Sequence, residues 1–283
     1  MPRTIEAEQI TEVVSRLCMQ AATVLPGDVE EALTRARDTE TSAMAQAVLD
    51  QIIENARIAR TERLPLCQDT GYAVVYVEIG QDVRVTGGYI GEAIQEGVRR
   101  GYREGCLRAS VISRPFEADR NTGDNTPAII HYDLVPGNRL KITVLPKGMG
   151  CENTSRLRMI KPSEGWEGVE AFVLDTVREA GPNACPPLIV GVGVGGTFDY
   201  CAYLAKRAVM RKLGTRNPDP QIAEIERRLE ERVRAMGIGP QGLGGETTAL
   251  GVHVIVHPCH IASVPVAVNI QCHSARQRTA VIE

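Results

Sequence analysis

The spacing of apolar residues changes near residue 63, and this change constrains the fold more than any other feature of the chain. From Ile5 to about Arg63 the apolar positions recur at helical intervals, for example at Ile10, Val13 and Leu17. Beyond this segment, short runs of β-branched residues alternate with polar ones and are bounded by Gly, Pro and Asp. The pattern predicts an α+β fold with a helical N-terminal part.

The later runs predict strands in neighbouring pairs, separated by further helices. AVVYVEI and VRV flank a Gly-Gln-Asp turn, and PAIIHYDLV and RLKITVL flank Pro136-Gly137-Asn138, so we expect two hairpins within a mixed or antiparallel sheet. No internal repeat is visible. We therefore expect a single compact unit over 1–283, in which a helical part covers about 1–63 and an α+β part about 64–283. Later helices are expected over 89–103, 163–180, 197–213 and 219–235.

Composition excludes several classes of function. The chain has 283 residues, 43% of them hydrophobic and 24% charged, which is typical of a globular protein. A net charge of −3 gives no long-range attraction to nucleic acid or anionic lipid. The longest apolar run, Pro186 to Val194, is too short to span a bilayer. Because the N-terminus lacks the features of a signal peptide, we expect a cytoplasmic enzyme of small molecules.

Eight cysteines offer possible metal ligands. They stand at positions 18, 67, 106, 151, 185, 201, 259 and 272, and no two form a CxxC pair. In a reducing cytoplasm thiols stay free for metal binding, so disulfides are the weaker interpretation. Composition alone does not select which cysteines would bind a metal.

The segment Leu66-Cys67-Gln68-Asp69-Thr70-Gly71 combines a thiol, an amide, a carboxylate and a hydroxyl before a predicted strand. A turn of this kind can direct several polar groups to one point. Two plainer interpretations remain open: an ordinary turn with a buried cysteine, and an Asx-type turn in which the carboxylate binds only local backbone.

LCQDTG resembles the first motif of the class I fumarate hydratases and L-tartrate dehydratases, and three further segments extend the likeness. PKGMGCEN resembles the glycine-rich loop of that family, and ACPPLIVGVGVGGTFDY and NIQCHSAR resemble its second and third cysteine motifs, in the family's order. The resemblance implies that Cys67, Cys185 and Cys272 ligate a [4Fe–4S] cluster with one iron lacking a protein ligand. Such an iron acts as a Lewis acid.

The activity that the resemblance implies is that of the alpha subunit of a hydro-lyase. We expect reversible hydration of fumarate to L-malate, a step of the tricarboxylic acid cycle, with dehydration of L-tartrate to oxaloacetate as the alternative. Since the chain ends soon after the third cysteine motif, we also expect a separate beta subunit that completes the active site. A contact between two alpha subunits is expected as well.

The same resemblance implies roles for five more residues. Asp69 is expected to perform acid–base chemistry. Gln68, Arg108, Gly150 and His260 are expected to bind the small dicarboxylate substrate. Removal of an unactivated C–H proton builds up negative charge, which calls for cations and hydrogen-bond donors.

Plainer interpretations remain for two of these residues, and the glycine-rich loop departs from the family form. Arg108 fits a helix surface, and His260 fits a structural role, with His257 as its nearest competitor. In the loop, Met149 and Cys151 stand where the family has a glycine and a serine. This departure weakens any inference about the substrate.

A remote alternative is a nicotinamide-dependent oxidoreductase. Gly191 to Gly196 satisfies the GxGxxG pattern between a predicted strand and a predicted helix. The acidic residue expected about twenty positions later should end a second strand, but that region is predicted to be helical.

Overall fold

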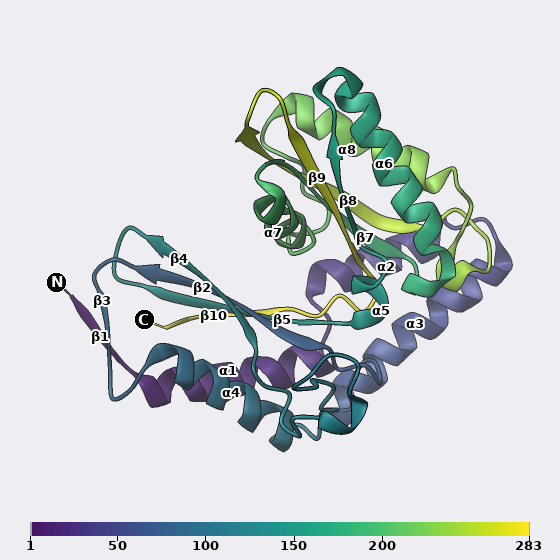
Figure 1. Cartoon of the computed structure of the whole chain (residues 1–283). Helices are drawn as coiled ribbons and strands as arrows, with labels where there is room; N and C mark the ends of the chain where they lie inside the picture. The colour runs from purple at the N-terminus through teal and green to yellow at the C-terminus, as the bar shows by residue number, and fades with distance from the viewer. Residues whose placement is uncertain (1, 283) are drawn as a thin grey trace. The chain divides into compact units, whose positions relative to one another are not determined.

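The computed structural model describes residues 2–282, and its mixture of helices and strands confirms the α+β class (Figure 1). The chain divides into two compact units. Unit 1 comprises Met1–Pro26, Ala56–Met149 and Arg276–Glu283, and unit 2 comprises Gly27–Asn55 and Gly150–Ala275. This division crosses the helical part expected over 1–63, because helical periodicity does not reveal which sheet a helix will cover.

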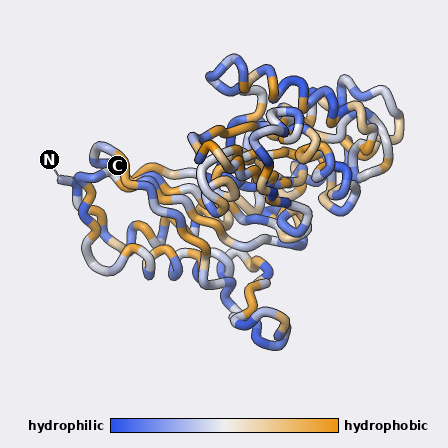
Figure 2. Tube along the Cα trace, turned by 45° about the horizontal axis from the view of Figure 1, so that its top comes forward, coloured by the Kyte–Doolittle hydropathy of each residue, from blue (hydrophilic) through white to orange (hydrophobic). Residues whose placement is uncertain are grey.

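Unit 1 contains one sheet covered by helices on one face, and a separate strand pair. Its elements are β1 (Arg3–Glu6), α1 (Ala7–Thr23), the C-terminal end of α3 (Ala43–Glu62), β2 (Tyr72–Gly80), β3 (Val83–Thr86), α4 (Ile90–Glu104), η1 (Ala118–Arg120), β4 (Ile129–Val135), β5 (Leu140–Lys147) and β10 (Arg278–Ile282). Helices α1 and α4 pack side by side against the sheet (Figure 1). Apolar residues concentrate along the strands (Figure 2).

The hairpin expected between AVVYVEI and VRV is absent, so this prediction was wrong. Strand β2 pairs with β4 and β5, whereas β3 pairs in parallel with β1. The burial pattern supplies the reason. Residues 73–77 of β2 are all buried, which suits a central strand with neighbours on both edges, whereas β3 has no buried residue.

The second expected hairpin is also absent, and the prediction of its two strands as partners was wrong. The sheet order is β10-β5-β2-β4, so β2 lies between β4 and β5. Strand β4 is parallel to β2, and β5 is antiparallel to it. The turn after β4 therefore passes over the end of β2, where a Cβ on Gly80 would lie only 2.4 Å from the Gly137 oxygen.

Unit 2 has its own four-stranded sheet with helices on both faces. Its elements are α2 (Gly27–Thr39), most of α3, α5 (Met149–Glu152, apart from its first residue), β6 (Arg156–Ile160), η2 (Pro162–Glu164), α6 (Gly165–Ala180), η3 (Gly181–Ala184), β7 (Leu188–Gly196), α7 (Phe198–Ala208), α8 (Pro220–Arg234), η4 (Pro240–Gly242), β8 (Ala249–Cys259) and β9 (Val264–Gln271). Helices α6 and α8 cover one face and α7 the other (Figure 1). None of the helices in residues 2–282 has the length and apolar character that crossing a membrane requires.

The two sheets share one arrangement of strand order and direction, although the outermost strand comes last in the chain in unit 1 (β10) and first of the four in unit 2 (β6). In unit 2 the order is β6-β9-β7-β8, where β7 is parallel to β8 and antiparallel to β9, and β6 is antiparallel to β9. Matching β2, β4, β5 and β10 with β7, β8, β9 and β6 reproduces every neighbour and direction. The sequence shows no repeat, because the arrangement of strands constrains which positions are apolar and not which residues occupy them.

The glycines of the GxGxxG pattern lie inside β7 and serve packing. A Cβ on Gly191 would be 2.3 Å from the Ala205 oxygen, and one on Gly193 would be 2.1 Å from the Cys201 oxygen. Helix α7 therefore lies against the strand with no side chain between the two backbones. This close approach accounts for the pattern without a dinucleotide.

Candidate functional site

The Cys67–Gly71 turn of unit 1 is joined to the glycine-rich loop through Asp69. Because Tyr72 pairs with Lys147, the turn before β2 and the loop after β5 lie at the same edge of the sheet. Asp69 Oδ1 accepts a hydrogen bond from the Gly71 amide (3.0 Å), and Oδ2 accepts one from the Met149 amide (2.8 Å). The Asx-type turn is thus present. The second carboxylate oxygen of Asp69 binds outside this turn, at the glycine-rich loop.

Three buried side chains hold the carbonyl oxygens of this turn. Arg276 Nη1 donates to the Asp69 oxygen (2.6 Å), the Tyr102 hydroxyl lies 2.9 Å from the Gly71 oxygen, and Asn125 Nδ2 donates to that same oxygen (3.1 Å). The exposed fractions of Arg276, Tyr102 and Asn125 are 2% or less. Burial raises the pKa of Tyr102, so its hydroxyl stays protonated and able to donate.

Sequence reasoning did not select these three residues. Arg276 lies within NIQCHSAR, so the motif offered a signal that was not used. Tyr102 sits among the charged residues of α4, and Asn125 lies in an irregular segment; neither carries a local signal. Tyr102 and Asn125 both bind the Gly71 oxygen, which lies 31 and 54 residues away from them in sequence.

Of the predicted substrate-binding residues, Gln68 belongs to the same turn and Arg108 lies beside it. Arg108 follows α4 in a non-helical segment, so it is not a helix-surface residue, and its carbonyl oxygen accepts a hydrogen bond from Thr70 Oγ1 (3.0 Å). Its side chain is exposed. Gln68 is exposed as well, and its Oε1 lies 3.4 Å from Cys67 Sγ. Unit 1 thus brings Cys67, Gln68, Asp69 and Arg108 together.

Unit 2 brings together the second and third cysteine motifs, which are separated by more than eighty residues. Cys185 precedes β7 and Cys272 follows β9, and Ile189 pairs with Gln271, so both cysteines lie at one end of the sheet. His273 Nδ1 lies 3.0 Å from the Cys185 carbonyl oxygen. The two segments are in direct contact.

Gln241 and the glycine-rich loop also contact the Cys185 and Cys272 segments. Gln241 Nε2 lies 3.1 Å from the Pro186 oxygen and 3.2 Å from His273 Nδ1. The glycine-rich loop is attached to the same strand end, since Asn269 Nδ2 donates to Glu152 Oε2 (3.0 Å) and the Ile270 amide donates to Ser155 Oγ (3.0 Å).

The environments of the cysteines differ. Cys185 is exposed, Cys67 is half-buried and Cys272 is buried at a strand end. Burial raises the pKa of Cys18 to about 12 and that of Cys201 to about 11, so these two thiols stay protonated and are poor ligands. Within residues 2–282, no group of three or more His, Cys, Asp or Glu side chains is arranged to hold a metal ion.

The thiol of Cys151 is directed away from solvent. Cys151 is 4% exposed within the apolar core of unit 2, and its Sγ lies 3.6 Å from the Ala184 oxygen. Gly150, beside it, is exposed in the single turn of α5. A Cβ on Gly150 would lie at an ordinary contact distance, 3.7 Å, from the Asn183 oxygen. The space around Gly150 therefore does not itself demand a glycine.

His260 lies at the opposite end of the unit 2 sheet from Cys185 and Cys272. Gly196 pairs with Cys259, whereas Ile189 pairs with Gln271, and these two positions of β7 are seven residues apart in sequence. A strand of that length spans roughly 23 Å. His260 instead lines an open depression of about 630 Å³ with Gly196, Thr197, Tyr200, His257, Pro258 and Cys259.

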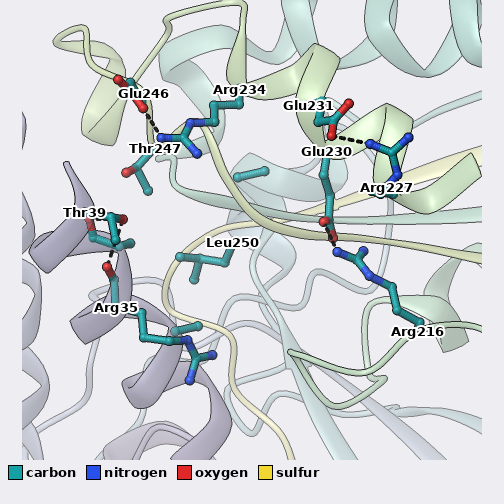
Figure 3. A pocket seen from close by; sticks show the side chains of 13 residues that line it. Arg35, Thr39, Arg216, Arg227, Glu230, Glu231, Arg234, Glu246, Thr247 and Leu250 are labelled. Carbon is teal, nitrogen blue, oxygen red and sulfur yellow. Dashed lines mark hydrogen bonds and ion pairs between the residues drawn. The ribbon is translucent and has the colours of Figure 1, made fainter. Parts of the chain in front are cut away.

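A second cavity of unit 2, about 390 Å³ in volume, contains no residue selected from the sequence (Figure 3). Its walls carry four arginines and three glutamates over a floor of alanine and leucine. Most of these charges are already paired, as Arg216 is with Glu230 and Arg234 with Glu246. The arrangement is a network of ion pairs joining α8 to its surroundings.

Glu40 anchors the loop beside this cavity. It is 4% exposed, and its carboxylate accepts hydrogen bonds from the amides of Glu246 and Thr247 and from Thr247 Oγ1 (2.8 Å). Burial alone would raise the pKa of Glu40, but these hydrogen bonds outweigh it and lower the pKa from 4.5 to about 2. A carboxyl with a lowered pKa stabilises the fold above its unfolded pKa, and this contribution is lost as the pH falls from 4.5 towards 2.

Comparisons with known proteins complete this description. The fold and site define an α+β protein in which the motif segments of each unit lie together at one end of its sheet. A family profile described as fumarate hydratase (Fumerase) matches residues 11–281. The chain therefore belongs to the fumarate hydratase family of hydro-lyases, as its motifs predicted.

The chain is also similar to individual members of this family. It is 43% identical over 274 residues to a Methanocaldococcus jannaschii protein provisionally named L(+)-tartrate dehydratase subunit alpha, covering 95% of this chain and 96% of that protein. It is 33% identical over 281 residues to the L(+)-tartrate dehydratase subunit alpha of Escherichia coli K12, covering 97% and 91%.

We expect Glu40→Gln to lower the free energy of unfolding by about 3 kcal/mol at pH 7, since a pKa change of about 2.5 units corresponds to that energy. The difference from the wild type should shrink as the pH falls from 4.5 to 2. Urea unfolding across this pH range measures it, with the exposed Glu31→Gln as the matched control. An E40Q effect that is independent of pH would contradict the argument.

Proposed function

We propose that this chain is the alpha subunit of an iron–sulfur hydro-lyase, with Cys67, Cys185 and Cys272 as the cluster ligands. The observation that carries the proposal is the contact between the Cys185 and Cys272 segments in unit 2, since it joins two of the three resembling motifs. The location of Cys67 beside Asp69 in the first motif is consistent with it.

The donor set suits a [4Fe–4S] cluster. Thiolates are the usual ligands of such clusters, and three of them leave one iron open. Cys185 and Cys67 are accessible to an incoming cluster, whereas Cys18 and Cys201 are buried and stay protonated. When bound, the cluster supplies a Lewis acid for the substrate hydroxyl.

The remaining chemistry falls to side chains around the Cys67–Gly71 turn. The exposed guanidinium of Arg108 suits a bidentate contact with a substrate carboxylate. The Gln68 amide offers a further hydrogen bond. Asp69, whose two carboxylate oxygens are held by backbone amides, is the proposed acid–base group, because a fixed carboxylate gives a defined direction for proton transfer. Gly150 is proposed to present its backbone amide to the substrate.

L-tartrate is the proposed substrate, with fumarate and malate as the second candidate. The motifs alone favoured fumarate, but the relatives described above carry the name of L(+)-tartrate dehydratase. Both substrates are dicarboxylates whose dehydration needs the same groups. The names of these relatives as alpha subunits support a separate beta subunit that completes the active site. A cytoplasmic location stays a prediction.

A contact between two alpha subunits would account for the position of His260. The two ends of β7, beside Cys272 and beside His260, are roughly 23 Å apart, so a substrate held at Cys272 would be beyond the hydrogen-bonding reach of His260 in the same unit 2. His260 therefore serves that substrate only from a second copy of the chain. Exposed apolar residues beside it, Phe198 and Ile261, offer surface for such a contact.

Serine replacement tests the proposed ligands. Anaerobic reconstitution of the wild-type chain with iron and sulfide should give a brown protein carrying four iron atoms, and Cys67→Ser, Cys185→Ser or Cys272→Ser should lose colour and iron, because a hydroxyl is a poor ligand for a soft cluster. Iron analysis and visible absorption measure this. Matched controls are the exposed Cys106→Ser and the buried Cys201→Ala, and both should keep the cluster. A colourless wild type would exclude the proposal.

A parallel assay decides the substrate. The chain is reconstituted anaerobically with the beta subunit and supplied with L-tartrate, malate or fumarate under identical conditions. We expect kcat/KM for L-tartrate to exceed that for malate by about 10-fold or more, since a site that binds the additional hydroxyl rejects an analogue lacking it. Faster turnover of malate would reverse the assignment, and high activity without the beta subunit would contradict its role.

Complementation tests the proposed source of His260. His260→Asn and Cys272→Ser chains should each be inactive with the beta subunit. Mixed before assembly, they should recover about a quarter of wild-type activity, because half of the alpha pairs are hybrids and each hybrid has one intact site. If His260 acted within its own chain, no mixture would regain activity.

A further inference from the structure

Arg276 is a buried cation of unit 1 to which the resemblance gives no role. Its side chain is 1% exposed, and Nη1 donates to the Asp69 carbonyl oxygen at 2.6 Å. Among the described residues its Nε has no hydrogen-bond partner. Burying a guanidinium with an unpaired donor is costly, and such groups in a folded protein call for a reason other than stability.

The guanidinium lies beside both segments that meet at Asp69. A Cβ on Gly148 would lie 3.4 Å from Arg276 Nη2 and 3.5 Å from Asp69 Oδ2, so the two charged groups flank the same glycine. The next residue, Met149, donates its amide to that carboxylate oxygen. The missing side chain at Gly148 lets the arginine and the carboxylate approach one backbone position.

We propose that Arg276 is a positioning residue that fixes the direction of the Asp69 carboxylate. Its hydrogen bond holds the peptide plane after Asp69, while the amides of Gly71 and Met149 hold the carboxylate itself. The catalytic consequence of this contact rests on the proposed function. Arg276 follows Cys272 by four residues in sequence and closes the segment NIQCHSAR.

The chain offers a matched control two residues away. Arg278 also belongs to unit 1 and donates to backbone carbonyl oxygens, those of Val24 (3.0 Å) and Leu25 (3.1 Å). Arg276→Met and Arg278→Met therefore remove the same group and the same kind of bond. The bond of Arg276 reaches the Asp69 turn, whereas those of Arg278 reach residues 24 and 25.

Hydrogen exchange on the full-length chain tests the positioning role without cluster or substrate. In R276M we expect the amides of Gly71 and Met149 to exchange about 10-fold faster than in the wild type, because their acceptor is no longer held. R278M should leave both amides unchanged. Equal exchange in R276M and the wild type, or equal acceleration in both variants, would overturn the proposal.

Kinetics of the reconstituted complex with the beta subunit test the consequence for the reaction. We expect R276M to lower kcat for L-tartrate about 100-fold with KM nearly unchanged, since a displacement of about 1 Å of a reacting group has an effect of that size. Arg276→Lys, which keeps the charge and one donor, should recover part of kcat and serves as well if R276M does not fold. A rise in KM with unchanged kcat would show a binding role and refute the proposal.

The two arms separate this proposal from the proposed function. If the wild-type complex converts none of the dicarboxylates, the proposed function fails, and the exchange arm still decides whether Arg276 holds the turn. If the complex is active and exchange in R276M is unchanged, only the role of Arg276 fails.

Discussion

The insertion of a central strand between two strands that follow each other in sequence organises both units. Strand β2 lies between β4 and β5, and β7 lies between β8 and β9. In each sheet, the segment before the central strand therefore meets the segment after its antiparallel neighbour. In unit 1 these are the Cys67–Gly71 turn and the glycine-rich loop, and in unit 2 the segments of Cys185 and Cys272. One topological constraint thus joins motifs that are distant in sequence.

Hydrogen bonds to backbone then fix what the topology has brought together. In unit 1 the carbonyl oxygens of residues 69–71 and both oxygens of the Asp69 carboxylate have donors. Several of these donors are buried, where an unpaired carbonyl would cost about 1–3 kcal/mol, so each bond limits the freedom of the turn. A rigid turn suits chemistry that depends on the direction of a carboxylate. Burial of apolar surface alone would not require the turn to be rigid.

Local sequence patterns predicted the elements, and long-range contacts decided their partners. The helices α4, α6 and α8 begin and end within two residues of their predicted limits, because amphipathic periodicity and turn residues are local signals. The hairpins were predicted wrongly, because alternation specifies a strand but not its neighbour. Tyr102 and Asn125 were missed for the same reason: their bonds reach Gly71 from far along the chain. The cysteine motifs were found by family resemblance, which local physics could not replace.

Backbone strain is retained at residues that hold the motif segments. Asn125, Cys185 and Gln241 adopt positive φ values of 60°, 52° and 53°, a conformation that costs a residue with a side chain about 1 kcal/mol. Glycine would remove this cost at Asn125, but the side chain accepts from the Ser110 amide (2.8 Å) and donates to the Gly71 oxygen (3.1 Å). Gln241 likewise contacts the Pro186 oxygen. The side chains of Asn125 and Gln241 therefore matter for the loops that they hold. The hydrogen bonds that these residues make from their strained positions offset the cost of the strain.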